Sequence, residues 1–189
     1  QFQAALTHGH PTALAASDLT AAAVADLAAG GDAAGLLERL VAYARSQRTV
    51  YHDWWLGPLW QRAHMDGNPS YGPDVFIARG WDECLGVLER VEAALTCPAP
   101  RDPCLVTGAG WVAEEALATG LYCFLLEPDD AVAVVRRAAV TSGDSDSIAC
   151  LAGAFAGAHL GLEAWPADWI QRIEYRDRLD RLAASLEPG

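Results

Sequence analysis

The chain has 189 residues, a formal net charge of −12 and a hydrophobic fraction of 52%, with only 8% aromatic residues. This hydrophobic fraction excludes a disordered chain, and the length favours a single domain over residues 1–189. The acidic charge, without a basic patch, argues against nucleic acid as the main partner, although a phosphorylated small molecule stays open.

The five cysteines are scattered along the chain and contain no C-x-x-C pair. Such an odd, scattered set argues against a disulfide framework or a zinc site and favours a reducing, cytoplasmic location. Apolar runs are interrupted well short of about 18 residues, so the sequence predicts neither a signal peptide nor a membrane span.

Helical periodicity runs through most of the chain, and no segment has a pattern that we expect to form a strand. Apolar spacing, caps and Gly or Pro stops predict helices, in chain order, over residues 11–30, 33–47, 80–96, 111–126, 130–140, 147–161 and 167–186. Helices joined by short loops predict an all-α fold.

Residues 50–78 differ from the rest because Trp and Tyr crowd together with Gly and Pro. This pattern predicts a short helix followed by an ordered loop. We expect the clustered tryptophans to pack against the core rather than to stack on a ligand, because large rings usually serve packing.

The stretch Gly143-Asp144-Ser145-Asp146-Ser147 carries two carboxylates and two hydroxyls at the start of a predicted helix. Such hard oxygen donors suit Mg²⁺ or Mn²⁺ rather than zinc or copper. Because alternate residues of a turn can point to one side, Asp144, Asp146 and Ser147 could converge on one cation. The alternative is a helix N-cap, in which these oxygens accept hydrogen bonds from free backbone N–H groups.

The helix predicted after this stretch is unusually small-sided. Gly153, Gly157 and Gly161 recur every four residues, and a glycine inside a helix costs ~1 kcal/mol relative to alanine. We therefore expect another helix backbone to approach this face closely and to fix the ligand loop. Cys150 and His159 lie on the same helix, and we expect a small apolar filler and a structural residue, respectively.

Two further segments place polar or aromatic groups at helix entries. His8 and His10 precede the helix that begins at Pro11, where they could donate hydrogen bonds to a sugar or phosphate or simply remain exposed. In Gly108-Ala109-Gly110-Trp111 the glycines let backbone N–H groups approach an anion. Trp111 could stack on a ring or pack into the core. This segment follows no strand, which excludes a dinucleotide-binding fold.

The order of these motifs resembles the ADP-ribosylglycohydrolase family, of the dinitrogenase reductase-activating glycohydrolase type. In that family a Gly-Asp-Thr-Asp-Thr motif usually precedes an Ala/Gly-rich helix, and here Ser stands for Thr at 145 and 147, which keeps the hydroxyl oxygen. The segments that carry the resemblance are Leu6-Thr7-His8-Gly9-His10, Gly110-Trp111-Val112 through Leu117, and Gly143 through Gly161.

The resemblance implies a compact, orthogonal all-α bundle with two Mg²⁺ or Mn²⁺ ions in a cleft. It implies that Asp144, Asp146 and Ser147 are metal ligands, with the two aspartates also catalytic. His8, Gly108, Gly110 and Trp111 would line the substrate site. The expected activity is hydrolysis of an ADP-ribose linkage, with an ADP-ribosylated protein or an ADP-ribose-containing small molecule as substrate.

The sequence departs from the family pattern in one respect. The Thr-Asp-Asp metal motif and the early acidic residue of the family's N-terminal half do not occur here. The resemblance therefore implies a C-terminal portion of the domain, which carries half of a dinuclear site. We expect a separate chain to supply the other half.

Two alternatives stay open. An Asp-x-Asp phosphatase would use Asp144 as nucleophile, but it needs an apolar strand before the motif, where Arg136 to Val140 instead has the pattern of a helix end. A degenerate, non-catalytic family member would act as an interaction or structural protein, with the aspartate loop serving only as a helix cap.

Overall fold

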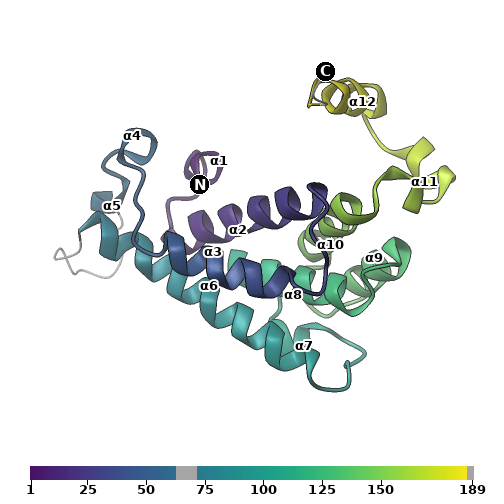
Figure 1. Ribbon diagram of the computed structural model, residues 1–189, viewed down its shortest axis with the longest axis horizontal. Coiled ribbons are helices and arrows are strands. Elements are labelled where there is room, and N and C mark those ends of the chain that lie inside the picture. Colours follow the sequence, from purple (N-terminus) through teal and green to yellow (C-terminus); the bar gives the residue numbers. More distant parts are fainter. Residues whose placement is uncertain (63–71, 187–189) are drawn as a thin grey trace.

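The computed structural model describes residues 1–62 and 72–186, and no strand occurs in these two ranges, which confirms the predicted all-α fold. The long helices form one bundle, and the two short C-terminal helices lie beyond it (Figure 1). The elements are α1 Phe2–Ala5, α2 Pro11–Ala28, α3 Leu36–Gln47, α4 Asp53–Leu56, α5 Leu59–Arg62, α6 Pro73–Leu95, α7 Cys104–Thr107, α8 Ala113–Leu126, α9 Ala131–Ala139, α10 Ser145–Leu160, the 3₁₀ turn η2 Leu162–Ala164, α11 Ala167–Arg172 and α12 Arg176–Leu186.

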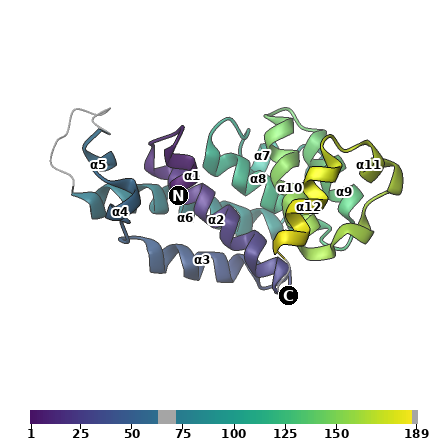
Figure 2. The same ribbon diagram turned by 90° about the horizontal axis from the view of Figure 1, so that it is seen from above.

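The core lies where α2, α6, α8 and α10 meet, and α9 packs along α10. These helices bury large side chains completely, among them Leu14, Trp81, Leu117 and Phe155. Figure 2 shows α3 and α6 along the long axis of the molecule and α10 across it, so the helices cross at steep angles. None of the described helices is both long and apolar enough to cross a bilayer.

Two predicted helix starts are wrong. Helix α3 begins at Leu36 rather than directly after Asp32, because Asp32 Oδ1 accepts a 2.7 Å hydrogen bond from Gly35 N–H and holds a turn ahead of the helix. Helix α6 begins at Pro73 rather than 80, with proline in its first turn. Gly80, expected to open the helix, lies inside α6. Glycine is required there because a Cβ would meet the backbone of Pro11.

The predicted single helix over 167–186 is also wrong, because it is two helices. The chain is extended at Ile173, which ends α11, and Tyr175 has a φ of 60°. A left-handed residue cannot continue a right-handed helix. The break carries α12 away from the bundle, and residues 171–185 are exposed.

The small-sided helix packs differently from the prediction. A Cβ at Gly153 or Gly157 would come no closer than 3.5 Å and 3.8 Å to a neighbouring atom, and Gly161 is the left-handed C-cap of α10 with open space around it. The close contact is made instead by Gly120 of α8. A Cβ there would lie 2.9 Å from Leu151 Cβ and 3.3 Å from Ala152 N.

The aromatic segment 50–62 only partly packs. Tyr51 and Trp60 contact the core, as predicted, but Trp54 is 84% exposed and Trp55 37% exposed, so the packing prediction is wrong for these two. Of the rest of the predicted loop, residues 63–71 lie outside the described residues, and residues 73–78 belong to α6, so the loop prediction is wrong there.

Two single-residue predictions on α10 have opposite outcomes. His159 packs its ring edge-on against Phe124 at 5.7 Å between centroids, which confirms a structural role. Cys150 is exposed, so the prediction of a buried filler is wrong. All five cysteines are free thiols.

Candidate metal loop and its neighbours

The aspartate loop lies between α9 and α10. Asp144 is the N-cap residue of α10, but its side chain makes no capping hydrogen bond. For Asp144 this differs from the N-cap alternative, whereas the Asp146 carboxylate interacts with the backbone N–H groups of Asp146 and Ser147 at the helix end. Asp146 lies in the first turn of α10 and is exposed, whereas Asp144 and Ser147 are half-buried.

The electrostatic environment keeps Asp146 ionised. A hydrogen bond shared with the Asp144 carboxyl, followed by the backbone N–H groups of Asp146 and Ser147, lowers the pKa of Asp146. An anion also gains from the free N–H groups at a helix N-terminus. A hydrogen bond between two carboxyl groups holds one proton between them, and a bound cation would take the place of that proton.

The aspartate loop is joined directly to the glycine loop at 108–110. The backbone N–H of Asp144 donates a 2.8 Å hydrogen bond to the carbonyl of Ala109. A Cβ at Gly110 would lie 2.8 Å from Ile148 Cδ1, and one at Gly143 would lie 2.8 Å from Cys104 Sγ. The fold thus brings two motifs, more than thirty residues apart in sequence, into contact.

The glycine loop has its own internal partner, Glu115. One oxygen of this carboxylate accepts hydrogen bonds from the N–H of Ala109 at 3.0 Å and of Gly110 at 3.2 Å. Gly108 N–H donates to Cys104 O at 3.3 Å. These three N–H groups are therefore occupied, which differs from the predicted anion-binding loop. Glu115 fixes the loop backbone instead.

The exposure of Trp111 decides between the two roles expected from the sequence, stacking on a ring or packing into the core. Its side chain is 71% exposed and the following Val112 is 48% exposed, so Trp111 does not pack into the core. The ring stands at the start of α8, directly after the loop that bonds to Asp144. It is therefore available to stack on a flat group held near the aspartates.

His8 is not bonded to this region. Its Nδ1 pairs with Thr7 Oγ1 at 2.9 Å, the side chain is exposed, and no hydrogen bond within the described residues joins it to either loop. The neighbouring His10 has a local role, because its Nδ1 accepts from Thr12 N–H as the cap of α2.

Asp102 is a residue that sequence reasoning missed. Its carboxylate accepts hydrogen bonds from Thr141 Oγ1 at 2.7 Å, Cys104 N–H at 3.0 Å and Ser142 N–H at 3.3 Å. Hydrogen bonds from the side chains of Ser142 and Thr141 and from backbone N–H groups lower its pKa. Asp102 therefore ties the start of α7 to the residues just before Gly143. An Asp two residues before a short helix was the available sequence signal.

The residues present fit part of a divalent-cation site. Asp144 and Asp146 supply carboxylate oxygens and Ser147 a hydroxyl, the donor chemistry of Mg²⁺ and Mn²⁺. Across residues 1–62 and 72–186, however, no three His, Cys, Asp or Glu side chains gather in a metal-binding arrangement. The donor set is thus two carboxylates and a hydroxyl, fewer than the six oxygen ligands that Mg²⁺ usually takes.

An all-α protein with an Asp-x-Asp loop at a helix N-terminus is not a phosphatase of the Asp-x-Asp type, because helix α9 rather than a strand precedes the loop. Residues 1–188 match the family described as ADP-ribosylglycohydrolase, and the chain belongs to that family.

Relatives of known name are ADP-ribosylhydrolases. The chain is 42% identical over 89 residues to ADP-ribosylhydrolase ARH3 of Bos taurus, 40% to that of Homo sapiens and 36% to that of Danio rerio. Each match covers 42% of this chain and 24% of the relative, so the chain spans about a quarter of the length of these relatives. No solved structure matches the chain significantly.

Proposed function

We propose that this protein is a metal-dependent hydrolase of an ADP-ribose linkage, with its candidate site at the aspartate loop. The observation that carries the proposal is the uncapped Asp144, held beside the glycine loop by the bond to Ala109. Family membership and the names of the relatives supply the substrate class.

In this proposal Asp144, Asp146 and Ser147 hold Mg²⁺ or Mn²⁺. Bound there, the metal would polarise a water molecule and the ribose hydroxyls. Other residues of the chain would hold the loop in place and orient the substrate. Glu115 holds the glycine loop against Asp144, and Trp111 offers an exposed ring to the adenine or another flat group. An aspartate oxygen not used by the metal would accept a proton.

We further propose that another polypeptide segment completes the site, because the described residues supply only part of a ligand set. Exposed apolar side chains flank the loop on the elements next to it. They are Leu105, Val106, Trp111, Val112 and Val140. A segment that covers these side chains while adding carboxylates would both bury apolar surface and complete the coordination.

Titration with MnCl₂ by calorimetry tests the proposed ligands. Wild-type protein, with any partner segment present, should bind Mn²⁺, and Asp146→Ala should weaken binding at least tenfold. Asp177→Ala, at an exposed position on α12, is the matched control and should bind as wild type does. Equal binding by Asp146→Ala and wild type, or none by either, would favour the non-catalytic alternative.

Release of ADP-ribose from arginine- or serine-modified protein tests the activity and should be lost in Asp146→Ala. Size-exclusion chromatography with mass spectrometry tests the second segment. A lone 20.1 kDa chain that is fully active with Mg²⁺ would refute the need for it.

A further inference from the structure

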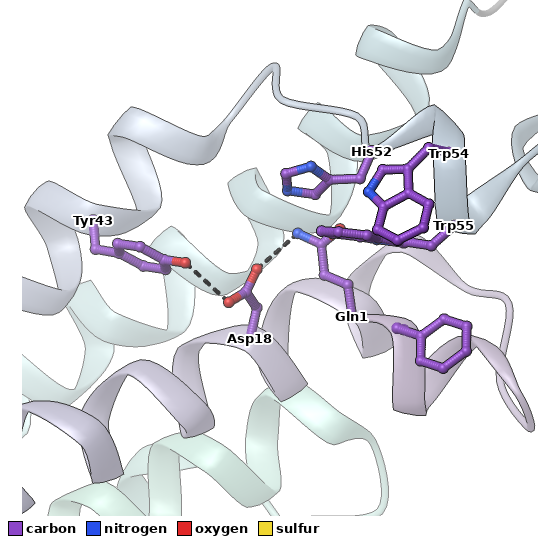
Figure 3. Close-up of a pocket in the computed structure, with 7 residues that line it drawn as sticks. Gln1, Asp18, Tyr43, His52, Trp54 and Trp55 are labelled. Atoms are coloured by element: carbon purple, nitrogen blue, oxygen red, sulfur yellow. Dashed lines mark hydrogen bonds between the residues drawn. The ribbon is translucent and has the colours of Figure 1, made fainter. Parts of the chain in front are cut away.

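A recess lies at a distance from the aspartate loop. It has a volume of about 700 Å³, within the usual range for ligand pockets. Both ribbon views place α4 toward one end of the molecule and α9 and α10 toward the other (Figures 1 and 2). Five rings line the recess, from α1, α3 and the α4 region (Figure 3). They are Phe2, Tyr43, His52, Trp54 and Trp55.

Three of these rings form a connected group. Trp54 and Trp55 lie 5.2 Å apart between centroids at an interplanar angle of 60°, and His52 lies 4.4 Å from Trp55. Phe2 is 56% exposed and Trp54 is 84% exposed. Large rings so exposed contribute little to the core, and their faces carry the negative side of the ring quadrupole.

The floor of the recess is made of hydrogen-bond acceptors. Asp18 accepts from Gln1 Nε2 at 2.7 Å and from Tyr43 Oη at 2.9 Å, as Figure 3 shows. Both partners donate to Asp18. A carboxylate has about four acceptor positions, so about two remain.

A second acceptor at the floor has no partner. Because Gln1 directs its amide nitrogen to Asp18, its Oε1 faces away, and this oxygen is buried without a hydrogen bond among the described residues. A buried oxygen without a donor costs free energy. A ligand in the recess does not reach this atom unless the side chains over it move. No side chain that lines the recess is that of Lys or Arg.

We propose that this recess binds an organic cation bearing N–H donors, a guanidinium or a primary alkylammonium group. The ring faces attract the positive charge, and the remaining acceptor positions of Asp18 take its N–H donors. An anion would meet Asp18 and the ring faces unfavourably. A neutral apolar ligand would leave those acceptor positions of Asp18 unused.

The test compares N-acetyl-L-arginine amide with its neutral near-isostere, N-acetyl-L-citrulline amide, and with N-acetyl-L-lysine amide. Affinity is measured by calorimetry on the full chain, and the site is located from the indole N–H resonances of Trp54 and Trp55 in ¹⁵N-labelled protein. We expect millimolar or tighter binding of the arginine or the lysine compound, at least tenfold weaker binding of citrulline amide, and shifts of both indoles.

Substitutions separate the recess from the rest of the surface. Trp54→Ala changes an 84% exposed side chain, so the fold should persist, and binding should weaken about fivefold through the lost ring. Asp18→Asn should weaken binding more and remove the preference for the cation over citrulline. Trp169→Ala, on α11 and 40% exposed, is the matched control and should change nothing.

Three outcomes would overturn the proposal. They are equal binding of the arginine and citrulline amides, binding that leaves both indole resonances unmoved, and no binding of either cation at millimolar concentration. Loss of metal binding at Asp146 would not affect this result, so the two proposals fail independently.

Discussion

The carboxylate of Asp102 accepts a 2.7 Å hydrogen bond from the hydroxyl of Thr141, across 39 positions of sequence. This contact, with those to Cys104 N–H and Ser142 N–H, connects the start of α7 to the segment that enters the aspartate loop. Asp102 is thus a positioning residue for Asp144, which follows Ser142 by two residues.

Asp102→Ala should therefore loosen the aspartate loop. We expect a loss of about 1–2 kcal/mol in the free energy of unfolding, because three hydrogen bonds to a partly exposed carboxylate disappear. Urea unfolding measures this loss. Asp129→Ala, at an exposed position without a hydrogen bond among the described residues, is the matched control and should stay within ~0.5 kcal/mol of wild type. Equal effects of the two substitutions would contradict the role of Asp102.

Acid should unfold the protein partly through two carboxyl groups. Hydrogen bonds lower the pKa of Asp102, and the hydrogen bonds from Arg48 lower the pKa of Asp82 below its usual 3.8. A carboxyl group whose pKa is lowered by folding stabilises the fold above its unfolded pKa. That stability is lost as the pH falls through the folded pKa. Stability should thus be level for these groups near neutral pH and fall below about pH 4.

Urea unfolding at a series of pH values checks this dependence. Asp102→Asn should flatten the slope below pH 4, because one shifted group no longer titrates. A slope identical to that of wild type would show that Asp102 does not contribute.

Gly120→Ala should destabilise the bundle. Its new methyl group would lie 2.9 Å from Leu151 Cβ, so α8 and α10 would have to separate. Overpacking of this kind typically costs about 1–3 kcal/mol. Gly157→Ala is the matched control, because the nearest atom would be 3.8 Å away in Trp165 and the added methyl group improves helix propensity by up to ~1 kcal/mol. Thermal unfolding that ranks the two variants in the opposite order would refute the contact.

The cysteines should differ in reactivity by position. Burial raises the pKa of Cys123 to about 12 and raises that of Cys84 further, whereas Cys97 and Cys150 are exposed. Because the thiolate is the reactive form, iodoacetamide should modify Cys97 and Cys150 in the native protein and leave Cys84 and Cys123 free. Peptide mass spectrometry reads out the sites. Modification of Cys84 at the rate of Cys97 would show that the core opens readily.

The sequence predicts the helices well where apolar periodicity and a terminating Gly or Pro agree, as in α2 and α8. It fails at boundaries set by a local hydrogen bond, such as the turn of Asp32 and Gly35 before α3. It also fails at Tyr175, whose left-handed backbone interrupts a sequence pattern that otherwise favours a helix. Boundaries depend on one or two contacts, whereas periodicity sums over many residues.

For the candidate site, sequence spacing identified the two aspartates and the exposed Trp111 as residues of interest. It did not reveal the partners that hold them. Glu115 occupies the glycine loop and Asp102 ties down the segment before Gly143 only because distant parts of the chain come together. The metal roles of Asp144, Asp146 and Ser147, and the substrate roles of His8, Gly108, Gly110 and Trp111, stay predictions.

The bond between Asp144 N–H and Ala109 O joins main-chain atoms alone. Replacing the side chain at either position leaves it in place, proline at 144 excepted, since proline has no N–H to donate. The carboxylate at 144 can therefore be deleted without moving the peptide unit that presents it. Variants at this position will report on ligand chemistry separately from loop architecture.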